Sequence, residues 1–504
     1  MSKTTRLSKS RLMAHLQCPK RLWLQTHCTE LLQEGGPTTA MAEGHRVGEV
    51  ARNLYPDGIL IESGDLTQDL ADTQRWLQTA PEKPLFEATL AAGGLLVKVD
   101  LLLPVDGGYR MVEVKSSTGP KPHQVLDASI QAWVLQQAGV SLKGVALACI
   151  DNQFVYAGGG DYKGLFRLHD LDQAARDHAA AMPDWIAAAQ ATVAGLEPVV
   201  EMGLQCNAPH PCPFATHCTS LNTATGQTEI EFPVELLPRH MGLAQALREE
   251  GYADLRDVPL ERLDRESHRR IWRITQEGQP EVLSQARQFS RSLPYPRYYL
   301  DFETIAFAVP RWANTRPYQQ VPFQFSCHIE CVPGSLMPNA YLSGDGSDPR
   351  REFALALIRA TSGTAYTDAG LDIDPTGPVL VYSAGFERGR IEDLAQHFPD
   401  LATPLLAINE RMVDLLPITR QNYYHPDMHG SWSLKAVVPT LGMDLAYEGM
   451  AVADGGMAQE AYLELIDPDT ADDRRHELRQ DLLDYCALDT YALVRLVEFF
   501  RGET

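Results

Sequence analysis

The chain has 504 residues, of which 44% are hydrophobic and 22% charged, and its formal net charge is −22. This length exceeds what one hydrophobic core usually organises, so more than one domain is expected. The acidity argues against a protein that coats nucleic acid by charge alone, but it leaves open an enzyme whose acidic side chains bind metal ions. The sequence has no apolar run of membrane-spanning length. The nine cysteines, an odd number, argue against a disulfide framework and favour the cytoplasm.

Residues 1–29 are basic and contain no Asp or Glu. One interpretation is a targeting segment. We favour a first helix that faces DNA and begins after Ser8, with Leu12 and Leu16 on its apolar face. This interpretation is preferred because Cys18 and Pro19 lie inside the basic stretch and belong with the cysteines discussed below.

Residues 1–225 have the pattern of a mixed α/β domain. Two strands are predicted at 95–100 and 109–114, joined as a hairpin by the turn at 104–108. A helix is predicted to follow at 122–138, and an alanine-rich helix at 171–194.

The predicted hairpin carries acidic residues suited to a divalent cation. Asp100 and Glu113 lie on adjacent strands and can share one or two Mg²⁺ or Mn²⁺ ions for phosphodiester hydrolysis. Lys115 faces the same side as Glu113, because strand side chains alternate with period two. Further candidate ligands from flanking elements are His45 and Glu87. The alternative is a hairpin whose charged residues only face solvent.

Four cysteines bracket this hairpin in the sequence, one early and three close together after it, namely Cys18, Cys206, Cys212 and Cys218. One distant thiol and three neighbouring thiols suit a structural metal site. Their spacing lacks the Cys-x2-Cys pairs of many zinc modules, so Zn²⁺ is possible but is not the first choice.

The segments LSKSRLMAHLQCPKRLWL, Gly44-His45, VKVDLLL, EVKSS and CNAPHPCPFATHC together resemble the RecB-like PD-(D/E)XK nucleases with an iron–sulfur site, a group that includes CRISPR-associated spacer-processing nucleases. The resemblance spans about residues 5–220. It implies an active site of His45, Asp100, Glu113 and Lys115, and a [4Fe-4S] cluster on the four cysteines. It also implies a DNA-contacting Gln131, although Leu135 stands where the family usually has an aromatic residue.

Residues 226–295 are rich in Arg, Glu and Leu with a helical period. A helix-hairpin-helix that grips backbone phosphates is one interpretation. The glycine pattern fits it poorly, so a helical linker is favoured.

Residues 296–504 are predicted to form a second α/β domain, with strands at 298–302, 323–331 and 379–383. Asp301 and Glu303 lie two residues apart on the first strand and therefore share a face. Tyr485 and Asp489 lie one helical turn apart. The three carboxylates can hold divalent metal ions, while Tyr485 orients or deprotonates a water. The alternative is a buried strand that ends in a capping acid.

Additional residues accompany this second set. Glu387, at a strand-to-helix junction, is a candidate fourth ligand, and Asp414 is the fallback. Lys435 can contact a phosphate, and Ser431 or Ser433 can cap its helix. The insertion RWANTRPYQQVPFQFS either lines a substrate groove or covers the sheet edge.

The motifs YLDFET and YCALDT resemble DnaQ-like, DEDD-type 3′→5′ exonucleases of the ribonuclease-H-like fold, in the subgroup with Tyr-x3-Asp. The chain departs from them at Glu387, where the family usually has Asp. The order of both parts resembles an uncharacterised bacterial family. The resemblance implies a metal-dependent, exonucleolytic nuclease acting on DNA, with RNA not excluded, in DNA repair or anti-phage or CRISPR-related processing. The alternative is a nucleic-acid-binding scaffold with inactive sites.

Overall fold

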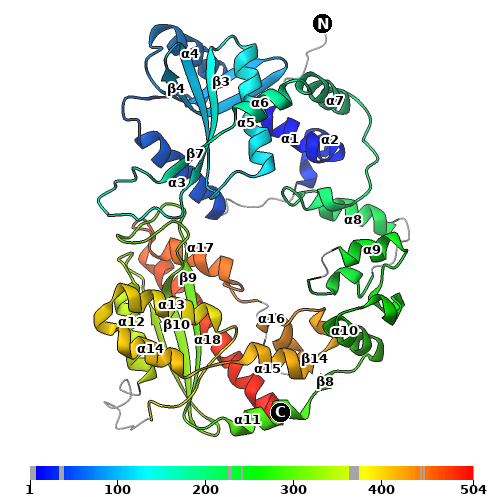
Figure 1. Ribbon diagram of the computed structural model, residues 1–504, viewed down its shortest axis with the longest axis vertical. Coiled ribbons are helices and arrows are strands. Elements are labelled where there is room, and N and C mark those ends of the chain that lie inside the picture. Colours follow the sequence, from blue (N-terminus) through cyan, green and yellow to red (C-terminus); the bar gives the residue numbers. More distant parts are fainter. Residues whose placement is uncertain are drawn as a thin grey trace. The chain divides into compact units, whose positions relative to one another are not determined.

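The computed structural model describes residues 7–32, 39–224, 230–239, 242–362, 374–442, 445 and 449–502. This part of the chain is mixed α/β and divides into two compact units (Figure 1). Unit 1 comprises Met1–Thr228 and Phe307–Gln319, and unit 2 comprises Glu229–Ala306 and Gln320–Thr504. No helix within the described ranges is long and apolar enough to cross a membrane.

Unit 1 is built on a seven-stranded sheet that contains the predicted hairpin. Strands β3, β4 and β5 pair antiparallel, with Leu101 opposite Val112, and β5 and β6 pair parallel. Both predicted strands of the hairpin are confirmed and are longer than expected. In sheet order the strands are β2 (Ile59–Leu60), β3 (Leu85–Ala92), β4 (Leu95–Val105), β5 (Gly108–Lys115), β6 (Leu142–Ile150) and β7 (Phe166–Asp170), with β1 (Leu7–Ser8) parallel to β4.

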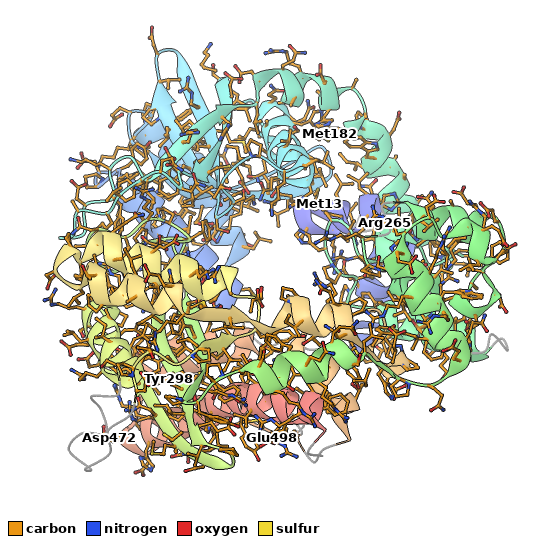
Figure 2. The ribbon with its side chains drawn as sticks, turned by 60° about the horizontal axis from the view of Figure 1, so that its bottom comes forward. Met13, Met182, Arg265, Tyr298, Asp472 and Glu498 are labelled. Carbon is orange, nitrogen blue, oxygen red and sulfur yellow. The ribbon has the colours of Figure 1, made fainter. Side chains whose placement is uncertain are left out.

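The predicted first helix is confirmed, because the Ser8 side chain accepts a hydrogen bond from the backbone N–H of Arg11 and caps α1. The predicted single helix at 171–194 is wrong. It is two helices, and the second begins beside Pro183, which lacks an N–H and fits only the first turn of a helix. The helices are α1 (Lys9–Gln17), α2 (Pro19–His27), α3 (Thr39–Asn53), α4 (Leu66–Thr79), α5 (Pro122–Gln137), α6 (Asp172–Ala179), α7 (Met182–Ala194) and α8 (Ala215–Ala224). Figure 2 labels Met13 of α1 and Met182 of α7.

Residues 307–319 pack within unit 1, although they follow β9 (Arg297–Ile305) of unit 2 in sequence. Ala308 and Val309 join a hydrophobic cluster with Val47 and Val50 of α3. The backbone N–H of Ala308 donates to Glu43 Oε2 at 3.0 Å. The first part of the predicted insertion therefore fastens to unit 1, and its last residues form the beginning of β10.

Unit 2 contains a five-stranded mixed sheet in which β9 is the central strand. Pairs β11–β10 and β10–β9 are antiparallel, while β9–β12 and β12–β13 are parallel. The three strands predicted here are all present. In sheet order they are β11 (Ser335–Leu342), β10 (Val321–Val332), β9 (Arg297–Ile305), β12 (Val379–Val381) and β13 (Met412–Asp414).

Helices cover both faces of this sheet, so β9 is buried on both sides. On one face Tyr298 and Leu300 pack with α12 (Arg350–Thr361), α13 (Gly385–His397) and α14 (Ala402–Glu410). On the other face Tyr299 packs with α18 (Asp472–Arg501), whose 30 residues carry both Tyr485 and Asp489. Asp472 and Glu498, labelled in Figure 2, lie near the two ends of α18. Three further helices are α15 (Leu415–Asn422), α16 (Leu434–Val437) and α17 (Gly455–Leu465).

The segment predicted as a linker contributes to the core of unit 2. Leu247, Ile271 and Ala286 share one hydrophobic cluster with Tyr299 and Val497. The segment contains α9 (Leu243–Glu249), α10 (Glu266–Glu277), α11 (Ser284–Ser292) and β8 (Glu281–Val282), which pairs with β14 (Tyr423–Tyr424). These residues are therefore an integral layer of the unit.

Candidate active sites

The carboxylates predicted from the motifs YLDFET and YCALDT lie close together between β9 and α18. Asp301 and Glu303 project from the same face of β9, and Asp489 reaches them from α18. One carboxylate oxygen from each of the three residues lies within 4.8 Å of the other two. Within the described ranges this is the only set of three His, Cys, Asp or Glu residues that meets this distance. The three therefore form a compact set of oxygen ligands.

Burial makes this cluster unfavourable as three free anions. Glu303 and Asp489 are each 8% exposed. Burial, together with the charge of Asp489, raises the pKa of Glu303 to about 8, while Lys435 opposes the shift. Burial and the neighbouring carboxylates also raise the pKa of Asp301 well above its usual value. The three residues could hold a divalent cation, whose charge would let all three ionise.

Tyr485 and Lys435 lie beside these carboxylates. Tyr485 is 3% exposed and lies one helical turn before Asp489 on α18. Lys435 Nζ lies 5.2 Å from the centroid of the Tyr485 ring and donates to the carbonyl of Ala453 at 2.6 Å. Of the two serines considered as caps, Ser433 caps α16 by accepting from the N–H of Ala436.

Glu387 and Asp414 have different surroundings. Glu387 lies in the first turn of α13, is 3% exposed, and has a pKa raised to about 7 by burial. Its charge contributes to raising the pKa of Asp301, and its Oε2 has no hydrogen-bond partner among the residues that the structure describes. Asp414 accepts backbone N–H groups of Ser383, Ala384 and Leu416, each at 3.0 Å. Asp414 is thus occupied in holding two turns, whereas Glu387 has an oxygen available.

The residues predicted for the first site line one cavity of about 400 Å³ in unit 1. Asp100 and Glu113 come from β4 and β5, and Asp100 Oδ2 accepts from the N–H of Val114 at 2.7 Å. The cavity lining includes all five predicted residues, namely His45, Glu87, Asp100, Glu113 and Lys115.

Sequence reasoning missed two residues of this site, Lys9 and Asp127. Lys9 Nζ lies 2.7 Å from Asp127 Oδ1 and 3.4 Å from Glu113 Oε1. Lys115 Nζ bridges the same two carboxylates, at 2.7 Å from Glu113 and 3.0 Å from Asp127. The Gln131 amide donates to Glu113 Oε2 at 2.7 Å and to Asp127 Oδ1 at 3.0 Å. Gln131 is fully buried, so in this structure it holds the two carboxylates.

The surroundings of Glu113 and Asp127 shift the pKa values of these two buried acids in opposite directions. Burial raises the pKa of Glu113 to about 7, with further contributions from Asp100 and Asp127. Burial also opposes ionisation of Asp127, but Lys9 and Lys115 outweigh it, so the pKa of Asp127 is lowered. Asp127 is therefore the permanent counter-ion of the lysines, and Glu113 remains the acid that a cation would ionise.

The segment 307–319 forms hydrogen bonds with two residues that lie next to the cavity lining in sequence. Glu43, which accepts from Ala308, lies two residues before His45 on α3. The hydroxyl of Tyr318 donates to the carbonyl of Ser116, directly after Lys115. The segment 307–319 therefore holds both the helix that carries His45 and the chain directly after Lys115.

The four predicted cluster cysteines line a separate small cavity of unit 1, together with Lys20 and Arg21. All four are free thiols. The side-chain amide of Gln17, next to Cys18, donates to the carbonyls of Gln205 and His210 at 2.7 and 2.8 Å. Burial raises the pKa of Cys212 and of Cys218, with the other cysteines adding to it. The fold thus brings the distant Cys18 to the three neighbouring thiols.

Comparison with known proteins finds a family model that matches part of the chain. A model described as a domain of unknown function, DUF2779, matches residues 298–433. The match includes Asp301, Glu303 and Glu387, and it ends before Lys435 and α18. No curated protein matches the chain.

Proposed function

We propose that this chain is a metal-dependent nuclease that hydrolyses phosphodiester bonds of DNA, with RNA not excluded as substrate. The convergence of Asp301, Glu303 and Asp489 carries the proposal, because buried, mutually close carboxylates are the ligand set of metal-assisted phosphodiester hydrolysis. The five-stranded mixed sheet with α18 across one face is compatible with the ribonuclease-H-like fold that the sequence resemblance implies. A second centre, in a PD-(D/E)XK-like arrangement, is proposed in unit 1.

In the proposed unit 2 centre, Asp301, Glu303 and Asp489 would hold Mg²⁺ or Mn²⁺, and Glu387 offers its unpartnered oxygen. When bound, the divalent cation supplies charge stabilisation to the phosphate and lowers the pKa of a bound water. Tyr485 orients the attacking water, as its place one turn before Asp489 suggests. Lys435 offsets the negative charge of the cluster and of the incoming phosphate.

In the proposed unit 1 centre, Asp100 and Glu113 would hold the cation, with His45 and Glu87 in the same cavity as further ligands. Lys115 neutralises charge that develops in the transition state. Lys9 doubles the positive charge next to Glu113 and reaches the cavity from the first turn of α1.

We further propose that Cys18, Cys206, Cys212 and Cys218 hold a [4Fe-4S] cluster, with Zn²⁺ as the alternative. The spacing of these cysteines lacks the Cys-x2-Cys pairs of many zinc modules, which favours the iron–sulfur cluster. Lys20 and Arg21, which line the same small cavity, would offset the negative charge of the bound group. Visible absorbance and equimolar iron and sulfide in anaerobically purified protein would support the cluster, whereas a colourless, zinc-loaded protein would contradict it.

The test is degradation of an end-labelled single-stranded oligonucleotide by the full chain with Mg²⁺ or Mn²⁺. Asp301→Asn and Glu113→Gln should each reduce the rate of their own centre by at least about 100-fold. The double variant should be inactive. Asp484→Asn is the matched control, because Asp484 is exposed on the same helix as Asp489. Undiminished digestion by the double variant would contradict the proposal.

A second candidate function is a nucleic-acid-binding scaffold. The observation that favours it is that both oxygens of Glu113 already have partners, Oε1 with the lysines and Oε2 with Gln131. Binding of DNA without cleavage across Mg²⁺, Mn²⁺, Ca²⁺ and Zn²⁺ would favour this function over hydrolysis.

A further inference from the structure

A hollow of about 630 Å³ in unit 2 is lined by four arginines and by no acidic residue. It lies between the helical segment before β9 and the loops that follow β12 and β14. Arg265 stands at the start of α10 and is labelled in Figure 2. The other three arginines are Arg239, Arg270 and Arg420. In a chain with a net charge of −22, such a uniformly positive lining is a local exception.

The charge of this hollow is available to a ligand. Within the described ranges, no carboxylate forms an ion pair with Arg239, Arg265 or Arg420, and all three are exposed. Neighbouring arginines of the same segment are neutralised, as shown by the pairs Arg248–Glu235 and Arg262–Glu250.

Arg270 is the deepest of the four arginines. Its Nε donates to Glu281 at 2.5 Å, and its Nη1 donates to the carbonyl of Arg420 at 2.6 Å. Its buried Nη2 has no hydrogen-bond partner in the described part of the chain. A buried guanidinium nitrogen without a partner is unusual in a folded protein and indicates a place for an acceptor.

Two serines that line the hollow lie close in sequence to residues of the unit 2 centre. Ser383 lines the hollow in the turn just before α13, whose first turn carries Glu387. Ser433 lines it two residues before Lys435. The hollow and the carboxylate cluster are thus joined by two short segments that contribute to both.

We propose that this hollow binds consecutive backbone phosphates of a single nucleic-acid strand whose end lies at Asp301, Glu303 and Asp489. Arginine forks and serine hydroxyls are the groups that proteins use for phosphate oxygens. A hollow of this volume has the size of a small-ligand site, which admits a few linked nucleotides and excludes a duplex. The inference rests on the proposed function, because it assigns the strand that the same centre would cut.

The experiment measures equilibrium binding of a fluorescent 15-nucleotide single strand to the full chain in EDTA, across a series of salt concentrations. The test variant is Arg265→Ala combined with Arg420→Ala. The matched control is Arg287→Ala combined with Arg291→Ala, two exposed arginines of α11 that remove the same charge outside the hollow. The test variant should bind roughly tenfold or more weakly, and its salt-dependence slope should fall by about 1.4, which is two phosphate contacts.

Three further arms complete the design. The charge-conserving variant Arg265→Lys with Arg420→Lys should keep the wild-type slope, and unchanged thermal unfolding of all variants shows that they fold. Inorganic phosphate and a mononucleotide should bind far more weakly than the oligonucleotide. Binding of either as tightly as the 15-mer would overturn the inference in favour of a small-anion site.

Equal losses in the test and control variants would overturn the inference while leaving the proposed function intact. If the Arg265→Ala, Arg420→Ala variant bound the oligonucleotide as tightly as the wild type, the inference would also be overturned and the proposed function would stand. If the wild-type chain bound no oligonucleotide, both the inference and the proposed function would fail.

Discussion

At the level of single residues, the cluster of Asp301, Glu303 and Asp489 has a cost in free energy. Like charges that share a buried site resist simultaneous ionisation, which the raised pKa values of Asp301 and Glu303 reflect. A fold retains such a cluster when a bound cation offsets the cost. The account therefore predicts opposite effects of a substitution in the absence and in the presence of metal.

Asp489→Asn should stabilise the metal-free protein by about 1–3 kcal/mol at pH 9, because it removes one of three mutually repelling charges. The same change should abolish the rise in melting temperature that Mn²⁺ produces in the wild type. Thermal unfolding with EDTA and with Mn²⁺ measures both effects. Asp484→Asn should show neither, and a metal-free destabilisation by Asp489→Asn would contradict the prediction.

Stability of the metal-free protein should fall as pH rises from about 4.5 to about 8. The pKa of Glu303 is about 8 in the fold against 4.5 in the unfolded chain, so in this window the folded state binds more protons. The contribution of Glu303 to the free energy of unfolding is fully present below pH 4.5 and is lost as the pH rises through 8. Urea unfolding of the wild type against Glu303→Gln isolates it. The variant should have the flatter profile, and parallel profiles would disprove the assignment.

Site residues whose partners lie a few positions away in sequence could be predicted from their spacing. Site residues whose partners are all distant in sequence could not. Spacing placed Asp301 with Glu303 and Tyr485 with Asp489, because periods of two and about four residues define a face. Lys9 acts on residues more than a hundred positions away, and its only signal was the basic N-terminal stretch. Asp127 had a weak local signal, since it lies four residues before Gln131 on α5.

At the level of elements, the strands of both sheets followed from apolar and alternating patterns, as the β4–β5 hairpin and β9 show. The packing of residues 307–319 in unit 1 could not be predicted, because the residues that they contact on α3 and after β6 are far away in sequence. Nor did pattern alone show that α9 and α10 join the core of unit 2, since an amphipathic helix does not reveal which surface it covers.

Val309→Asp should detach the segment 307–319 from unit 1. Val309 is fully buried among Val47, Val50 and Leu165, so a carboxylate there costs at least about 3 kcal/mol. We expect faster trypsin cleavage after Arg311 and a loss of nuclease activity at the unit 1 centre. Val332→Asp is the control, because Val332 is 57% exposed at the end of β10. Unchanged proteolysis of Val309→Asp would refute the fastening role.

At the level of the whole molecule, a cluster on the four cysteines would tie the first helices to the end of unit 1. It closes a loop of about 190 residues, and closing such a loop offsets about 5 kcal/mol of chain entropy. Cys18→Ser should therefore lose iron and lower the stability of unit 1 by several kcal/mol, as hydrogen exchange of its amides would report. Cys28→Ser, outside the cavity, should change neither. Full iron content in Cys18→Ser would exclude Cys18 as a ligand.

The net charge of −22 is compatible with the proposed function on nucleic acids because charge is unevenly distributed in the chain. The two proposed metal centres are acidic, whereas the lining of the arginine-lined hollow contains no acidic residue. Bulk acidity lowers non-specific attraction to phosphate, so contact with a substrate depends on local sites. We therefore expect the chain to bind only those nucleic-acid strands that reach a local positive site such as the arginine-lined hollow.

If Asp301, Glu303 and Asp489 form a metal centre, the chain should bind a divalent cation there. Electron paramagnetic resonance of Mn²⁺ titrated into the full chain measures this directly, in a Glu113→Gln background that removes the unit 1 centre. Bound Mn²⁺ is expected in that background, and adding Asp301→Asn or Asp489→Asn should abolish its binding, whereas adding Asp484→Asn should not. The absence of bound Mn²⁺, or equal binding by the Asp301→Asn protein, would contradict this expectation.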